Sequence, residues 1–418
     1  FEEGVTRQST GTSGLGGRRA TDDRAISLYV HIPFCASRCP YCDFATAPAT
    51  SALRARYMSA LARELREQGA ALGRPVVRTL YVGGGTPSLL EPDEIAALAG
   101  ALRSSFALEL AEATVEANPA TLDRARLEAW AALGITRLSL GAQSFSAHGL
   151  RELGRTHQPE DVAPAVKAAR SLGLAVSVDL IFGWPGQTLD EWRGDLASAV
   201  ALGVDHVSCY PLELVLDPEE SSVDWPGGGW EVVRRWRERA AMVQPGDDTV
   251  ARMYRIAERL LAAAGFDHYE IANWARPGQR CRHNLVYWRN GQWLGAGTGA
   301  HAHLGGRRSR RPGSLLAYLN AIEGAQPRID DPSADDAVDT AMLGLRLAEG
   351  LDLATYEVRF GMVAAAHVRR VLADVALKSL VRVADGCARL TPRGRLLASE
   401  VFVRLLPDDP HAAREEQN

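Results

Sequence analysis

The chain has 418 residues, enough for two or more domains, and its composition of 46% hydrophobic and 23% charged residues is that of a globular protein. A formal net charge of −4 gives no electrostatic basis for binding nucleic acid, and no apolar run approaches the length needed to span a bilayer. Residues 1–25 lack the apolar core of a signal peptide and are expected to form a disordered leader, with residues 407–418 as a polar tail. The sequence therefore predicts a cytoplasmic protein without a nucleic-acid partner.

Hydrophobic runs and amphipathic stretches alternate regularly between residues 26 and 215. The runs predict six strands, over residues 27–32, 79–82, 113–116, 136–140, 174–182 and 204–210. The stretches between them predict helices over residues 52–72, 91–106, 122–133 and 189–202. Helical material is also expected between the fourth strand and residue 172. Repeated strand–helix units imply a parallel sheet, which is either doubly wound or an incomplete (β/α)6 barrel. In both arrangements, ligands bind at the carboxyl ends of the strands.

Three cysteines, Cys35, Cys39 and Cys42, follow the first predicted strand with the spacing C-x3-C-x2-C. Thiolates are soft ligands that suit iron–sulfur clusters, and three of them can hold a [4Fe–4S] cluster whose fourth iron stays open to a substrate. A zinc site remains an alternative, although it would usually add a fourth Cys or His ligand nearby. His31 lies close to the loop but is expected to pack against it. The other three cysteines are scattered along the chain, which argues against a disulfide framework.

Chemically distinctive residues also end the other predicted strands, so they are expected to share one rim with the cysteine loop. The second strand runs into a glycine-rich segment, residues 83–87, that lets the backbone approach a ligand closely. No Gly-Lys-Ser/Thr follows it, so phosphate binding is not predicted. Gln143 follows the fourth strand. Glu116 and Asp179 interrupt apolar strands, and a carboxylate in such a place needs a partner. That partner is either an arginine of the barrel, such as Arg137 or Arg155, or the hydroxyl or ammonium group of a ligand.

The chain beyond the sixth strand divides into two parts. Residues 216–330 are predicted to contain an insertion and to complete the barrel. The Trp- and Arg-rich stretch 217–247 is expected to be a solvent-exposed loop, a solvated excursion from the barrel, with a short helix at 232–243. A lineage insertion or a contact with a membrane partner are the alternatives. Residues 331–406 predict helices at 339–347, 363–380 and 393–406, with a hairpin between 381 and 391. We expect this second unit to cover the barrel mouth or to pack on it.

The pairing of the cysteine loop with Gly-Gly-Gly-Thr-Pro after the second strand resembles the radical S-adenosylmethionine (SAM) superfamily. Within it, the segments YVHIPFC, VEANP, GAQSF and DLIFGWPGQ, which begin at residues 29, 115, 141 and 179, resemble the HemN/HemW group from about residue 28 to about residue 406. The resemblance implies an incomplete (β/α)6 radical SAM barrel, over residues 26–215, followed by a small winged-helix-like α+β domain. It also implies a [4Fe–4S] cluster and SAM as cofactors.

The HemN/HemW group has two branches, the oxygen-independent coproporphyrinogen III dehydrogenases and the HemW proteins, regarded as haem chaperones. This chain resembles the second branch because Phe44 stands where dehydrogenases have a further cysteine, and because no ordered extension is expected before the first strand. It also carries the H-N-x-x-Y-W motif of HemW proteins from His283 to Trp288. The resemblance implies haem delivery to membrane respiratory haemoproteins. Radical decarboxylation of a porphyrinogen, or another radical SAM reaction, remains the alternative.

The resemblance assigns SAM contacts to the matching positions, and SAM would also chelate the open iron. An electron donor would supply the cluster with the electron that cleaves SAM to methionine and a 5′-deoxyadenosyl radical. The implied SAM-binding residues are Tyr29 and Tyr41 beside the cluster, Gly84, Gly85 and Thr86 at the methionine part, and Glu116, Gln143, Arg155 and Asp179 at the other polar groups.

The resemblance also leaves open which side chain ligates haem. His283 is either a haem ligand or a packing residue, and Cys281, two residues away, is an alternative ligand. His301 and His303, in a glycine-rich segment, are surface, structural or ligand residues, with no basis in the sequence for ranking these roles.

Overall fold

The computed structural model describes residues 25–214, 229–374 and 377–406. The expected leader up to residue 24, the polar tail, and much of the Trp-rich stretch, including Trp225, lie outside the described residues.

Six parallel strands form the centre of the fold, and they neighbour one another in the order in which they occur along the chain. They are β1 (Ile26–Ile32), β4 (Val76–Gly84), β5 (Ala107–Ala117), β6 (Arg137–Gln143), β7 (Ala175–Phe182) and β8 (His206–Pro211). Their apolar residues are largely buried, as expected for strands that pack helices on one face and a barrel interior on the other. This confirms the predicted incomplete (β/α)6 barrel.

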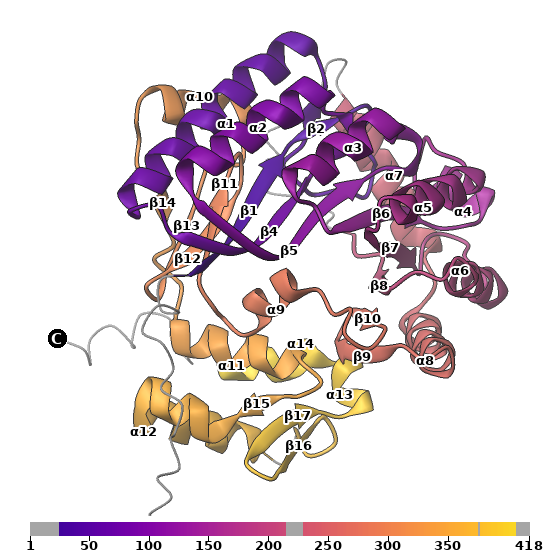
Figure 1. Ribbon diagram of the computed structural model, residues 1–418. Coiled ribbons are helices and arrows are strands. Elements are labelled where there is room, and N and C mark those ends of the chain that lie inside the picture. Colours follow the sequence, from indigo (N-terminus) through magenta and orange to yellow (C-terminus); the bar gives the residue numbers. More distant parts are fainter. Residues whose placement is uncertain (1–24, 215–228, 375–376, 407–418) are drawn as a thin grey trace, which may run out of the picture.

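Helices cover the outer face of this sheet (Figure 1). They are α1 (Ser51–Ala71), α2 (Pro92–Ser105), α3 (Arg124–Leu133), α4 (Ala147–Glu152), α5 (Val162–Ser171), α6 (Leu189–Ala201) and α8 (Asp247–Ala263). Local signals set their ends: α2 begins with a capping box between Glu91 and Glu94, and α3 ends at Gly134 in the left-handed conformation.

The sheet extends well beyond the six predicted strands at both edges. Beside β1 lies the parallel strand β11 (Trp293–Ala296), followed by antiparallel β12 (His301–Leu304), β13 (Arg307–Arg310) and β14 (Ile329–Asp330). Beside β8 lie β10 (Asn273–Ala275) and β9 (Asp267–Glu270). Among the described residues β9 and β14 do not pair, so the barrel stays open.

The buried carboxylate of Glu64 ties α1 to this extension. Its side chain is fully buried and accepts hydrogen bonds from Arg311 Nε at 2.6 Å, Arg328 Nη1 at 3.3 Å, Tyr318 Oη at 2.9 Å and the Gly297 backbone at 2.8 Å. Tyr318 lies on α10 (Leu315–Glu323). One carboxylate from the barrel helix thus holds four groups of the segment 297–328, which connects the strands of the extension.

The last domain has its own hydrophobic core and a three-stranded sheet. Its elements are α11 (Asp336–Arg346), β15 (Leu351–Asp352), α12 (Leu353–Leu372), β16 (Val381–Ala384), β17 (Cys387–Leu390), α13 (Pro392–Leu396), α14 (Ala398–Phe402) and the 3-10 turn Val403–Leu405. The predicted hairpin is present. The helix expected at 363–380 instead begins at Leu353, is interrupted at Gly361 and ends at Leu372. The helix expected at 393–406 breaks at Leu397.

The last domain packs at the amino-terminal ends of the barrel strands, beside α9 (Arg282–Trp288), rather than over the cysteine loop (Figure 1). Glu270 of β9 forms a bridge with Leu347 and an ion pair with Arg346 of α11 at 3.4 Å. Of the two expected arrangements, the domain packs on the barrel and does not cover its mouth at the cysteine loop. Within the described ranges, no helix is long and apolar enough to cross a bilayer.

Candidate functional site

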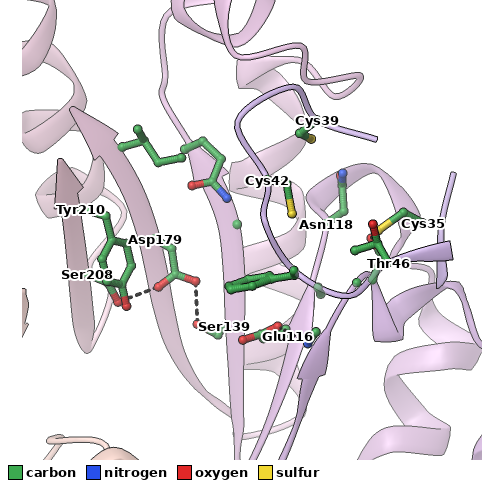
Figure 2. Close-up of a pocket in the computed structure, with 18 of the residues that line it drawn as sticks. Cys35, Cys39, Cys42, Thr46, Glu116, Asn118, Ser139, Asp179, Ser208 and Tyr210 are labelled. Carbon is green, nitrogen blue, oxygen red and sulfur yellow. Dashed lines mark hydrogen bonds between the residues drawn. The ribbon is translucent and has the colours of Figure 1, made fainter. Parts of the chain in front are cut away.

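A cavity of about 500 Å³, called here the barrel cavity, opens at the carboxyl ends of the parallel strands. The three cysteines of the loop line it together with Glu116 and Asp179 (Figure 2). In all, eight of the residues expected at the rim line the cavity. Those residues are Tyr41, Gly84, Gly85, Thr86, Glu116, Gln143, Arg155 and Asp179. The structure therefore brings eight of the nine expected SAM residues to one cavity, and Tyr29 lies elsewhere.

The cysteine loop is held from two sides. Cys35 ends the short strand β2 (Phe34–Cys35), which pairs with β3 (Ala47–Pro48), and its sulfur lies 3.4 Å from Thr86 Oγ1. Arg155 Nη1 donates to Cys39 Sγ at 3.4 Å, and its Nη2 donates to the Gly141 carbonyl at 3.0 Å. A guanidinium beside these sulfurs suits thiolates and a cluster of negative charge.

The three cysteines at the rim suit a [4Fe–4S] cluster, which spreads three thiolates over three iron atoms. The same cavity contains buried polar atoms without hydrogen-bond partners among the described residues, namely Arg155 Nε, Thr46 Oγ1 and Thr114 Oγ1. Such atoms are usually paired in folded proteins, so they suit a polar ligand.

The two rim carboxylates accept hydrogen bonds from neutral groups. Glu116 accepts from Tyr81 Oη at 2.8 Å and from the Gly84 backbone at 2.9 Å. Asp179 accepts from Ser139 and Ser208 at 3.0 and 2.6 Å (Figure 2). Neither carboxylate forms an ion pair with Arg137 or Arg155 among the described residues, which contradicts the internal salt bridge that we considered as an alternative. Arg137 pairs instead with Glu112 at 3.2 Å.

Desolvation raises the pKa of Glu116 from 4.5 to about 7, and it also raises the pKa of Asp179. Between pH 4.5 and about 7 the folded protein keeps a proton on Glu116 that the unfolded chain releases, so the folded state loses stability as pH rises through this interval. We therefore expect Glu116→Gln, which stays neutral, to lose less stability than the native chain between pH 5 and 8. The free energy of unfolding of both proteins, measured with urea at pH 5 and pH 8 without SAM, tests this expectation. An equal loss of stability in the variant and the native chain would contradict the raised pKa of Glu116.

The glycine triplet is required mainly by contacts within the protein. A Cβ atom at Gly84 would lie 2.4 Å from the His31 ring, one at Gly85 would lie 2.6 Å from the Pro33 backbone, and one at Gly83 would lie 2.8 Å from the Glu116 carboxylate. Gly84 also has φ of 116°. The triplet thus lets β4 lie directly against the base of the cysteine loop and leaves its backbone exposed to the cavity.

Strand alternation contains a signal that the sequence reasoning missed. Along β6, β7 and β8, polar side chains that line the cavity recur at every second position, because alternate residues of a strand face the same side. They are Arg137 and Ser139, Ser177 and Asp179, and His206, Ser208 and Tyr210. Gln143 adds a further signal, since a non-glycine residue with φ of 64° is uncommon and often marks a functional site.

Helix α7 (Gly229–Val243) packs on the cysteine loop, so the expectation of a solvated excursion is wrong for this part of the Trp-rich stretch. The side chain of Arg237 is 1% exposed, donates to the carbonyls of Pro40 at 3.0 Å and Cys42 at 3.4 Å, and forms an ion pair with Asp43. The neighbouring Trp236 donates to the Glu152 carbonyl. A helix beyond the sixth strand therefore fixes the backbone between the second and third cysteines.

We expect Arg237→Met to lower the free energy of unfolding by about 2 kcal/mol, because it leaves buried loop carbonyls without a donor. The same change should speed the loss of iron to a chelator. Arg239→Met is the matched control, since Arg239 lies on the same helix in an exposed ion pair with Glu152 and should change stability by less than about 1 kcal/mol. Equal effects of the two substitutions would contradict the role of Arg237.

His283 does not line the barrel cavity and instead lies in the protein core beneath it. Its side chain is fully buried, with Nδ1 2.8 Å from Thr79 Oγ1 and Nε2 2.8 Å from Tyr287 Oη, and burial lowers its pKa to about 3. Its backbone donates to Glu112, which also accepts from Cys281 Sγ. Both ring nitrogens are engaged, and these contacts suit a packing role that fixes α9 under the barrel.

The comparisons with known proteins agree with this geometry. The family model of the radical SAM superfamily matches residues 29–199, and that of the HemN C-terminal domain matches residues 332–397. A heme chaperone HemW from Mycobacterium tuberculosis is 38% identical over 94% of this chain and 97% of that protein, and one from Bacillus subtilis is 33% identical over 90% and 98%.

Among solved structures, the coproporphyrinogen III oxidase HemN from Escherichia coli is similar with a TM-score of 0.77, over 92% of this chain and 90% of that one. Its identity of 23% shows a shared fold. Membership of the superfamily implies a [4Fe–4S] cluster and SAM, which the thiols and unpaired polar atoms of the barrel cavity fit. The fold, the cysteine loop and the near full-length similarity together show that the chain belongs to the HemW family of radical SAM proteins.

Proposed function

We propose that this protein is a haem chaperone that also binds a [4Fe–4S] cluster and SAM, and that it delivers haem to respiratory haemoproteins. The observation that carries the proposal is the similarity over nearly the whole chain to proteins named heme chaperone HemW. Phe44 supports it, because it occupies the position at which the dehydrogenase branch has a further cysteine, and it is 63% exposed beside the cluster loop.

The side chains of the barrel cavity have distinct roles in this proposal. Cys35, Cys39 and Cys42 hold three irons, and Arg155 offsets the negative charge beside them. The cluster and SAM, when bound, supply one-electron chemistry that the protein itself cannot perform. Glu116, Gln143 and Asp179 receive hydrogen bonds from the hydroxyl and ammonium groups of SAM, Tyr41 covers the ligand, and the backbone from Gly84 to Thr86 contacts its methionine part.

The partners in this proposal are haem, SAM, an electron donor and membrane respiratory haemoproteins that receive the haem. We place the protein in the cytoplasm, because the described cysteines are free thiols and the cluster ligands must stay reduced.

A second candidate function is oxygen-independent coproporphyrinogen III dehydrogenation. The observation that favours it is the wall of the barrel cavity, where Arg137 has Nε and Nη1 buried without hydrogen-bond partners among the described residues. A guanidinium of this kind suits a carboxylate, and propionate groups are carboxylates.

Two parallel assays separate these functions. Haemin titration of the protein with its reconstituted cluster should give saturable binding with a shifted Soret band. Anaerobic incubation with coproporphyrinogen III, SAM and dithionite should give no protoporphyrinogen. Absence of haemin binding would contradict the chaperone proposal, and formation of protoporphyrinogen would favour the dehydrogenase.

A further inference from the structure

A second cavity, of about 650 Å³, lies beside the barrel cavity, and we call it the second cleft. The segment that follows Cys42 borders both cavities, because Asp43 and Phe44 line each of them. Tyr29 lines the second cleft and stacks on Tyr81 of the barrel cavity, with ring centroids 6.2 Å apart. The two cavities are thus neighbours on the inner face of the sheet, and the size of the second is within the range of cofactor sites.

The walls of the second cleft combine aromatic and cationic side chains. The aromatic residues are Tyr29, Phe44, Tyr287, Trp288 and Trp293, and the cationic residues are Arg308, Arg310 and Arg311. Leu343 of α11 adds an apolar contact from the last domain. Aromatic faces with a cationic edge suit a flat, largely apolar ring that carries acidic groups.

Four histidines lie in or beside this cleft, and three of them are engaged. His31 contacts Tyr29 Oη through Nδ1 and the Ala45 carbonyl through Nε2. His283 has both nitrogens occupied, as described above. His303 contacts the Gly291 carbonyl at 2.7 Å and Asp336 at 2.9 Å.

His301 is the exception among these four histidines. It is exposed, it lines the cleft, and neither of its ring nitrogens has a hydrogen-bond partner among the described residues. Desolvation, and then Arg310 and Arg328, lower its pKa, which favours the neutral imidazole, whose unprotonated nitrogen can donate a lone pair to a metal.

Arg310 lies directly across from His301 in the β12–β13 ladder. Directly opposed residues of an antiparallel pair project from the same face with Cβ atoms about 5 Å apart. The described residues give Arg310 no ion pair, whereas Arg308 is committed to Asp339 and Asn290 and Arg311 to Glu64. Trp288 also lines the cleft and has its indole N–H buried without a partner in the described ranges.

We propose that the second cleft is the haem site, in which His301 ligates the iron, Arg310 binds a propionate, and Phe44 and Trp288 contact the porphyrin ring. This inference rests on the proposed haem-binding function and assigns its place. At this place, the side chains of Tyr29 and Phe44 separate the haem from the SAM cavity. The Y-W part of the H-N-x-x-Y-W motif then contacts the haem, while the histidine of the motif packs in the core.

The first test is ligation of the iron. Haemin binding to His301→Gly, in the protein with its reconstituted cluster, should weaken by about tenfold or more and lose the Soret band of the native complex. Free imidazole should restore the band, because the pocket for the ring remains. His367→Gly is the control, since His367 lies on α12 outside both cavities and should leave binding unchanged. A native Soret band in His301→Gly without imidazole would overturn the assignment.

The second test separates the ring and its acidic groups from the iron. Iron-free protoporphyrin IX should bind His301→Gly as tightly as the native protein, and it should bind Arg310→Glu about tenfold more weakly, with Arg382→Glu as an exposed control. Unchanged binding to Arg310→Glu would contradict the propionate contact. If the native protein itself bound no haemin, the proposed function would fail. If it bound haemin and the His301 and Arg310 variants matched it, the location alone would be wrong.

Discussion

Replacement of Cys39 by serine is expected to abolish the [4Fe–4S] cluster. The loop supplies three thiolates, so the substitution leaves two soft ligands and an alcohol, which is a poor ligand for iron–sulfur clusters. Iron and sulfide content after reconstitution should fall to background, and the broad absorbance of the cluster should disappear. SAM binding should weaken with it, because the open iron is one of the groups that hold SAM.

Cys387→Ser is the matched control for this loss. Cys387 is the first residue of β17 in the last domain and lines neither cavity. Its substitution should leave the iron content unchanged. Full iron content in Cys39→Ser, or an equal loss in Cys387→Ser, would contradict the assignment of the cluster to the loop.

Glu64→Ala is expected to cause the largest loss of stability. It removes the carboxylate that pairs with the buried side chain of Arg311 and with Arg328, and it leaves Tyr318 without its acceptor. Breaking a buried ion pair by removing one partner costs about 3–5 kcal/mol, because the remaining charge stays buried. The free energy of unfolding, measured with urea, should fall by about that amount.

The control is Glu67→Ala, one turn along the same helix. Glu67 forms an exposed ion pair with Arg63 at 2.7 Å, so its loss should cost less than about 1 kcal/mol. If Glu64→Ala were no more destabilising than Glu67→Ala, the carboxylate would not be what joins α1 to the sheet extension.

The barrel could be predicted from the sequence because its strands are short apolar runs separated by amphipathic helices. The repeated units left the strand order open between a doubly wound sheet and a barrel, and the resemblance to radical SAM proteins implied the barrel. Residues 216–330 were expected to complete the barrel, but the individual strands of the extension were not predicted, because β13 reads Arg-Arg-Ser-Arg and β14 has two residues. Such strands have no apolar pattern and form only against a sheet that already exists.

The candidate site was predicted in part for a similar reason. The cysteine loop and the rim residues end consecutive strands, so chain order brings them together. The contacts of His283 could not be read in this way, because Thr79 lies 204 residues earlier in the chain. The same holds for Arg237, which comes from a Trp- and Arg-rich stretch without a recognisable motif and reaches the cysteine loop across 194 residues.

The second cleft could not be predicted from the sequence because its residues come from several separate segments. They come from β1, the end of the cysteine loop, α9, three strands of the extension and α11. His301 and His303 could not be ranked in the sequence. Their surroundings distinguish them, since His303 is buried against Gly291 and Asp336 while His301 lines the cleft.

Haem transfer tests the central claim most directly. The protein, loaded with one equivalent of haem, would be mixed with membrane vesicles from haem-deficient cells that contain apo-cytochromes, with haem-loaded albumin as the reference donor. We expect its Soret band to fall while the reduced cytochrome spectrum appears in the vesicles, at a rate above that from albumin. Haem that stays on the protein, or that reaches the vesicles no faster than from albumin, would contradict a chaperone function.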